Sequence, residues 1–152
     1  MQSQKGFTLV EVLIVVAIIG ILSNIAIPQV QEALWRARAA SIVSDFTLVR
    51  KAALEFYRDN DRMPVNGTVN RPAVELDPYL EGKVDWISPN PWVGAYVWEN
   101  WENKKHGQRT GIKYGFSLKK PNPGLVTAIR TVYDGPFEES VYDKYTFPIT
   151  AY

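Results

Sequence analysis

The chain opens with a long apolar run. Residues 7–27 read FTLVEVLIVVAIIGILSNIAI, with Glu11 as the single charged side chain, and Pro28 follows. As a helix rising about 1.5 Å per residue, this run would extend about 31 Å, close to the hydrocarbon thickness of a bilayer. The pattern predicts one membrane-spanning helix near the N-terminus.

A one-sided helical pattern continues beyond Pro28. Apolar residues recur at steps of four and three along one face, namely Trp35, Ala39, Ile42, Phe46, Val49, Ala53 and Phe56. This spacing predicts one helix from about Phe7 to Asp59, about 80 Å long. Its first half is apolar all round and needs a membrane or a bundle, whereas its second half needs only a head domain on one side.

The predicted helix has a weak stretch between Gly20 and Pro28. Gly20 has poor helix propensity, and Pro28 removes a backbone donor and clashes with the carbonyl of Asn24. A bilayer would hold such a helix together. The stretch could open where neighbouring helices replace lipid.

Beyond the helix the pattern changes to short segments bounded by Gly, Pro or Asn. Residues 60–64 include residue types that favour turns, which predicts the end of the helix. Strands are predicted at 96–101, 112–118 and 125–132, with a weaker one near 145–147. The predicted fold class is therefore α+β, a long N-terminal helix packed against a small antiparallel β-sheet head.

Composition excludes several classes of site. The chain has no cysteine and one histidine, His106, so disulfides, thiolate metal sites and multi-histidine centres are not available. The 17 basic and 16 acidic residues nearly balance, which gives no general attraction to nucleic acid. A local basic cluster between Lys104 and Lys113 lies among glycines and favours a solvated loop. Four tryptophans between Trp86 and Trp101 favour a disulfide-free core built from large aromatics.

Three interpretations compete for the N-terminal segment: a cleaved secretory signal, a plain membrane anchor and a prepilin signal. The secretory interpretation fits poorly, because its basic region would be Lys5 alone and its apolar region would be too long. Glu11 distinguishes the other two. Holding this carboxylate in the membrane costs about 2–3 kcal/mol. The residues alone leave two explanations open: Glu11 reaches the headgroups, or it pairs with a cation on a neighbouring chain.

The segment Lys5-Gly6-Phe7-Thr8-Leu9-Val10-Glu11 resembles the signal of type IV pilins and type II secretion pseudopilins. The resemblance implies that prepilin peptidase cuts between Gly6 and Phe7 and that the new amine of Phe7 is methylated. It also implies that Glu11 pairs with the Phe7 amine of an adjacent subunit. Such a pair would neutralise two charges inside an apolar filament core.

Two further stretches of the chain resemble major pseudopilins of type II secretion systems. They are residues 56–60 with Pro64, and residues 90–96, where that family ends its long helix and begins its sheet. From about Lys119 onward the chain departs from the family pattern.

The resulting layout is a leader at 1–6, a transmembrane assembly helix at 7–30, an amphipathic continuation at 31–59 and a globular α+β head at 60–152. The resemblance implies a bacterial inner-membrane protein that crosses once, with the head in the periplasm. Its implied partners are like subunits, minor pilins or pseudopilins, prepilin peptidase and an inner-membrane assembly platform.

A calcium site is a further expectation. Asp134, Glu138, Glu139 and Asp143 lie within ten residues in a turn-rich stretch. Ca²⁺ gathers about six to eight oxygens at flexible geometry, and major pseudopilins use a calcium-bound C-terminal loop. No D-x-D-x-D-G spacing is present, and solvated loop acids are the competing interpretation.

The sequence and the resemblance together predict a filament subunit without enzymatic activity, and the resemblance implies that the filament is the pseudopilus of a type II secretion system. One alternative is a type IV pilin for adhesion, motility or DNA uptake. A more distant alternative is a membrane-anchored enzyme or binding domain, which would need a polar site cluster in the head.

Overall fold

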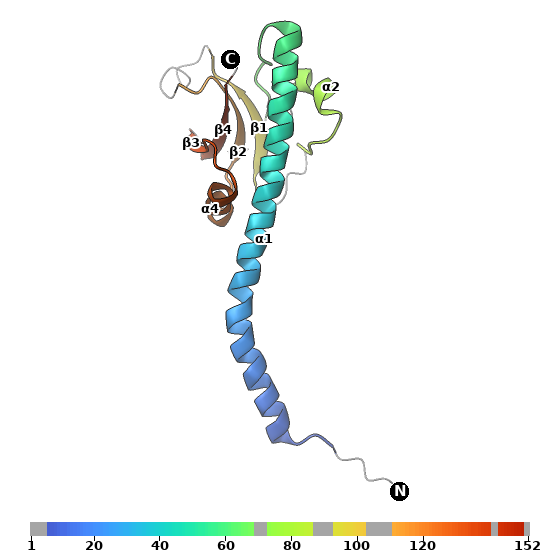
Figure 1. The fold of residues 1–152 in the computed structure, drawn as a ribbon, viewed down its shortest axis with the longest axis vertical. Coiled ribbons are helices and arrows are strands. Elements are labelled where there is room, and N and C mark those ends of the chain that lie inside the picture. Colours follow the sequence, from blue (N-terminus) through green and yellow to red (C-terminus); the bar gives the residue numbers. More distant parts are fainter. Residues whose placement is uncertain (1–5, 69–72, 87–92, 103–110, 141–142, 151–152) are drawn as a thin grey trace. The chain divides into compact units, whose positions relative to one another are not determined.

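The computed structural model describes residues 6–68, 73–86, 93–102, 111–140 and 143–150. The chain divides into two compact units, Met1–Trp35 and Arg36–Tyr152, here called the anchor unit and the head unit. The predicted α+β class is confirmed (Figure 1). In chain order the elements are α1 (Leu9–Asn60), the 3-10 helix η1 (Val74–Leu76), α2 (Asp77–Leu80), β1 (Ala95–Asn100), β2 (Tyr114–Lys119), α4 (Pro123–Val132), β3 (Glu138–Ser140) and β4 (Lys144–Ile149).

The one-sided part of α1 buries the face that the sequence predicts. Its buried residues are Ala39, Ile42, Phe46, Val49, Ala52, Ala53 and Phe56. Of the predicted stripe, only Trp35 stays half-exposed. The helix ends where Asp61 takes a left-handed backbone conformation (φ 54°) and its N–H donates to the Tyr57 carbonyl at 2.8 Å. The Asn60 side chain donates to the Phe56 carbonyl at 2.9 Å, which satisfies one of the last carbonyls of the helix.

The head contains a four-stranded sheet in the order β1-β2-β4-β3, with every pair antiparallel. Trp98, Phe116 and Phe147 stand opposite one another across β1, β2 and β4, so they share one face. Phe46 of α1 stacks on Phe147 with ring centroids 4.6 Å apart and on Phe116 at 6.3 Å. The helix and the sheet of the head therefore meet through aromatic rings.

The tryptophan-rich segment supplies core, as predicted. Trp86, Trp98 and Trp101 are 4%, 0% and 5% exposed. Trp92 lies outside the described residues, as do 103–110, which hold most of the predicted basic cluster.

The opposite face of the sheet holds buried polar groups. Glu99 and Lys144 form an ion pair with side chains 7% and 16% exposed. Ser117 and Thr146 are both fully buried and share a hydrogen bond of 2.8 Å. Gly115 allows the strands to approach here, because a β-carbon at this position would lie 2.4 Å from Thr146 Cγ2. Each buried polar side chain on this face thus has a partner, as burial of such groups requires.

The prediction of a strand at 125–132 is wrong. These residues belong to α4, which starts with Pro123 at its first turn and Asn122 as its N-cap, the Asn122 side chain accepting from the Gly124 N–H at 2.9 Å. Asn followed by Pro is a helix-start signal that outweighs the β-branched residues after it. Leu125, Val126, Ala128 and Ile129 are buried, which is helical spacing.

The other strands are confirmed with shifted bounds, and one was not foreseen. The weak signal near 145–147 corresponds to the whole of β4, and the short edge strand β3 pairs with it. Glu138, Glu139 and Ser140 are all polar and exposed or half-exposed, so they carry no alternation from which a strand could be predicted.

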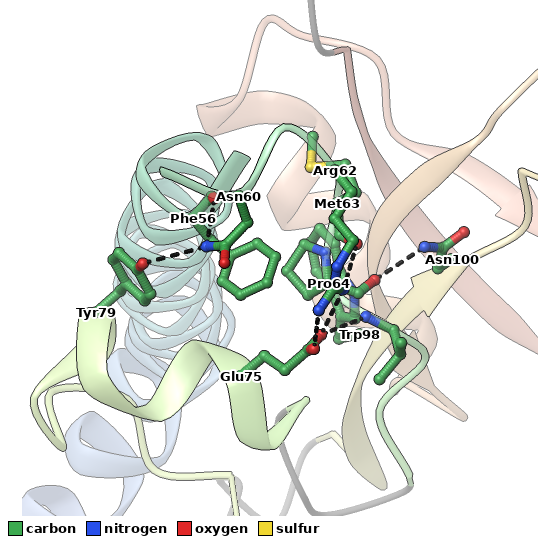
Figure 2. A network of polar contacts seen from close by, with 10 residues as sticks. Phe56, Asn60, Arg62, Met63, Pro64, Glu75, Tyr79, Trp98 and Asn100 are labelled. Atoms are coloured by element: carbon green, nitrogen blue, oxygen red, sulfur yellow. Dashed lines mark hydrogen bonds and ion pairs between the residues drawn. The ribbon is translucent and has the colours of Figure 1, made fainter. Parts of the chain in front are cut away.

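A polar network fixes the chain where it leaves α1 (Figure 2). The Arg62 guanidinium donates to both carboxylate oxygens of Glu75, and the Val65 N–H donates to Glu75 Oε2 at 2.8 Å. The Pro64 carbonyl accepts from Trp98 Nε1 at 3.2 Å and from Asn100 Nδ2 at 2.9 Å. The segment after α1 is thereby tied to β1 on one side and to η1 on the other.

A carboxylate is half-buried at the contact between α1 and β1. The Tyr96 hydroxyl donates to Asp45 Oδ2 at 2.9 Å. Burial raises the pKa of Asp45; the Tyr96 hydrogen bond opposes this shift, and the charge of Asp85 adds to it. Burial and the Asp45 charge likewise raise the pKa of Tyr96, which keeps its hydroxyl protonated as the donor.

Replacing Asp45 by Asn should stabilise the head at neutral pH. The amide oxygen still accepts from Tyr96, and the cost of a half-buried charge disappears. Because the folded pKa is raised, the contribution of Asp45 is complete below the ordinary aspartate pKa of about 3.9 and is lost as pH rises through the raised value. The difference in unfolding free energy between Asp45→Asn and wild type should therefore grow across that interval in urea titrations. Parallel pH profiles for the two proteins would contradict the assignment.

Candidate functional site

The segment that the sequence singles out for processing lies at the start of the anchor unit. Gly6, Phe7 and Thr8 are not helical, and α1 begins at Leu9. Phe7 is 82% exposed. A β-carbon at Gly6 would meet no atom of this chain within 4 Å, and the Gly6 backbone is not in the left-handed region. Nothing in the packing of the described residues therefore requires glycine at this position.

Thr8 and Glu11 form a capping box at the start of α1. The Thr8 carbonyl accepts the first helical bond, from the Val12 N–H, which identifies Thr8 as the N-cap. The Thr8 N–H and hydroxyl donate to Glu11 Oε2 at 2.8 and 2.7 Å, and the Glu11 N–H donates to Thr8 Oγ1 at 3.3 Å. Glu11 therefore has a partner within its own chain, which the two sequence-based explanations did not include. The T-x-x-E spacing is a signal that would have found it.

The anchor unit exposes almost all of its apolar surface. Large apolar side chains from Phe7 to Leu34 are between 48% and 82% exposed. Within the described residues, α1 is the one helix long and apolar enough to cross a membrane, and its most apolar stretch is not buried inside the molecule. This surface needs lipid or other helices around it on every side.

The predicted weak stretch is helical in this structure. α1 is continuous through Gly20 and Pro28. Pro28 has no N–H to donate, so the Asn24 carbonyl lacks its usual helical partner. A β-carbon at Gly20 would meet no atom of the chain within 4 Å beyond the helix itself. The opening of this stretch stays a prediction.

The four acids of the predicted calcium site are spread over different elements. Asp134 follows α4, Glu138 and Glu139 are neighbours on β3, and Asp143 precedes β4. Because successive strand residues point to opposite faces, Glu138 and Glu139 do not converge. In the described part of the chain, no three His, Cys, Asp or Glu side chains form a group that could hold a metal. The calcium site gains no support and stays a prediction.

Comparisons with known proteins cover both units. Residues 1–24 match the family model for the prokaryotic N-terminal methylation motif, and residues 33–110 match the model named PilW, C-terminal. The type II secretion system core protein G of Klebsiella michiganensis is 31% identical over 104 residues, which is 62% of this chain and 72% of that protein. No solved structure matches the chain significantly.

Pilins match a shorter part of the chain more closely. A fimbrial protein of Pseudomonas aeruginosa is 53% identical over 53 residues, 35% of this chain and 34% of that protein. The type IV major pilin protein PilE1 of Neisseria gonorrhoeae is 38% identical over 65 residues, 43% of this chain and 39% of that protein. These names denote structural subunits of fimbriae and pili and not enzymes.

A methylation motif heading an exposed apolar helix, with a small antiparallel head on the far half of that helix, defines a class of membrane-anchored filament subunits. The chain belongs to the type IV pilin-like family, which includes pilins and the core protein G subunits of type II secretion systems. The apolar helix and this membership together imply anchoring in the inner membrane.

Replacing Thr8 by Ala should fray the first turn of α1, because it removes the side-chain acceptor for the Glu11 N–H and one donor to Glu11. Loss of an N-cap costs about 1 kcal/mol, so hydrogen exchange of the Glu11 and Val12 amides should accelerate about fivefold in full-length protein held in detergent micelles. Thr8→Ser keeps the hydroxyl and should exchange like wild type. Equal exchange in the alanine and serine variants would show that the capping box does not form.

Proposed function

We propose that this protein is the polymerising subunit of a type II secretion pseudopilus, made with a leader that ends at Gly6. The observation that carries the proposal is the exposed apolar half of α1, whose first part belongs to a motif for N-terminal methylation. Similarity to the core protein G relatives extends over 104 residues, whereas the pilin matches extend over 53 and 65. The likeness to the secretion proteins therefore includes part of the head unit.

Cleavage between Gly6 and Phe7 is supported by the geometry of both residues. They are exposed and precede the first helical turn, so a protease can reach the non-helical backbone there. Gly6 is not needed by the fold, which leaves recognition by an external partner as the reason for glycine. Removal of residues 1–6 takes away Lys5 and leaves 16 basic and 16 acidic residues.

Glu11 has two roles in this proposal. Within one chain it completes the cap of α1 through Oε2. In the filament, Oε1, which accepts no hydrogen bond from the described residues of the subunit, pairs with the Phe7 amine of a neighbour. The local cap holds the carboxylate at the helix N-terminus, where the helix dipole also favours negative charge. The head lies in the periplasm, and minor subunits and an inner-membrane platform complete the assembly.

Mass spectrometry of the protein from its own membranes tests the processing. The mature chain should begin at Phe7 and carry a methyl group on the new amine. Gly6→Phe should leave the leader in place without affecting the head, because a side chain at this position meets open space. A wild-type chain that keeps Met1, or one cut after Ala39, would refute the processing.

Three variants separate the two roles of Glu11. Glu11→Val removes cap and charge, Glu11→Gln keeps a capping side chain but no charge, and Thr8→Ala weakens the cap but keeps the charge. Both Glu11 variants should insert in the membrane at least as well as wild type, because a costly charge is gone. Both should yield few sheared filaments, whereas Thr8→Ala should retain most of them. Normal filament yield from Glu11→Gln would exclude the intersubunit charge pair.

The second candidate is a type IV pilin for adhesion, motility or DNA uptake. It is favoured by the 53% identity to the Pseudomonas aeruginosa fimbrial protein, although this match covers only 35% of the chain. Deletion of the gene distinguishes the two. Loss of secreted protein with normal twitching and transformation supports the pseudopilus, and the reverse pattern supports the pilin.

A further inference from the structure

The side of α1 that faces away from the sheet carries a shallow trough in the head unit. The trough has a volume of about 390 Å³, and Leu54 is its half-buried apolar residue. Three cations and one anion line it, the anion being Glu55, 3.9 Å from Lys51. The lining residues recur at helical spacing along one face: Thr47, Arg50, Lys51, Leu54, Glu55 and Arg58. We call this face the basic trough.

A separate cleft of about 620 Å³ lies beside the C-terminal end of α1. Three carboxylates from distant segments line it, namely Asp61, Glu102 and Glu138. Its cations are Arg62, which is already paired with Glu75 (Figure 2), and Lys113. We call it the acidic cleft.

Aromatic rings add to the chemistry of the acidic cleft. Tyr57 and Tyr114 line it together with the carboxylates. Burial and a hydrogen bond to Glu102 raise the pKa of Tyr114 to about 12, which places the Glu102 carboxylate against a neutral phenol. Carboxylates beside neutral aromatic rings favour the ammonium or guanidinium group of a Lys or Arg side chain.

Filament assembly explains why one chain carries both surfaces. A contact that repeats without closing must join two different patches, so each copy needs both a donor and an acceptor surface. The trough and the cleft have opposite charge and lie at the same end of α1. Along the helix, Arg58 and Arg50 precede Asp61 by about 5 and 17 Å at about 1.5 Å per residue. Two parallel copies shifted by a distance in this range would bring trough and cleft to one level.

We propose that the basic trough of one subunit docks into the acidic cleft of the next copy of this chain. Lys51 and Arg58 supply the cations, with side chains 74% and 73% exposed. Within its own chain Arg58 donates to Asp59 at 3.0 Å, but such exposed ion pairs are weak and can be exchanged for carboxylates of a neighbouring copy. Glu138 and Asp61 receive them at the rim of the cleft, and Leu54 covers the apolar part of the contact. This docking rests on the proposed filament function and defines which surfaces of the heads meet.

Engineered cysteines test the docking in the full chain, assembled in its own membranes, because the sequence has no cysteine to interfere. Lys51→Cys and Glu138→Cys in one chain should give a ladder of crosslinked multimers under mild oxidation. Each single variant should stay monomeric on a denaturing gel, and co-expression of the two single variants should give dimers only. Lys51→Cys with Thr127→Cys, which moves the second thiol to the exposed side of α4, is the matched control and should give no ladder.

Charge exchange gives a second measurement that needs no crosslink. Lys51→Glu and Glu138→Lys should each lower the yield of sheared filaments about fivefold, since each turns an exposed attraction into a repulsion. The combined exchange should recover wild-type yield. Raising the salt concentration should weaken wild-type crosslinking, because the contact is charged and accessible to ions.

The outcomes separate the docking from the proposed function. Wild-type filaments visible by electron microscopy, without a ladder from the Lys51–Glu138 pair, would overturn the docking alone. Dimers from Lys51→Cys by itself would overturn it too, because the trough would then meet another trough. A ladder from the Thr127 control would show unspecific contact and count against it. A wild-type chain that forms no filament at all would overturn both proposals.

Discussion

The first half of α1 cannot bury its apolar surface within its own molecule, and the rest of the structure follows from this constraint. Its large apolar side chains are at least 48% exposed, so the anchor unit is stable only inside lipid or among other helices. A head fold cannot cover a helix of this length, and the head unit begins only at Arg36. One helix therefore lies in two environments, first lipid or other helices and then the head. The change from all-round to one-sided apolarity marks the boundary between them.

The head is held together without any covalent crosslink, by aromatic stacking and by backbone carbonyls that accept side-chain donors. Phe46 lies against Phe116 and Phe147, and Tyr133 meets both Phe46 and Phe147 edge-on at 5.7 and 5.2 Å. Such pairs contribute about 0.5–1.5 kcal/mol each beyond the area they bury. Rings of this size fill the core of a small domain whose sequence has no cysteine for a disulfide.

Sequence alone gave the long helix, its buried stripe and the fold class, because the 3.6-residue periodicity is strong over many turns. The strand prediction at 125–132 is wrong because the Asn122–Pro123 helix start outweighs the β-branched residues that follow it. β3 could not be predicted either, because its residues are all polar and show no alternation of apolar and polar positions. At the candidate site, Gly6, Phe7 and Glu11 could be named from a motif. The Thr8–Glu11 cap could have been named as well, since its spacing is local. The acidic cleft could not, because it joins residues far apart in the chain.

The double hydrogen bond at the Pro64 carbonyl bears on how this family can diversify. Trp98 and Asn100 hold β1 directly against the segment that leaves α1, and the Gly67 N–H adds a bond of 3.1 Å to the Trp98 carbonyl. The residues that begin and end the segment between α1 and β1 are thus hydrogen-bonded to each other, whatever the length of that segment. Each doubling of a closed loop costs only about 0.6 kcal/mol. The exposed turn at Glu81 and Gly82 is consequently a place where evolution, or an engineer displaying a peptide, can insert residues without moving the helix relative to the sheet of the head.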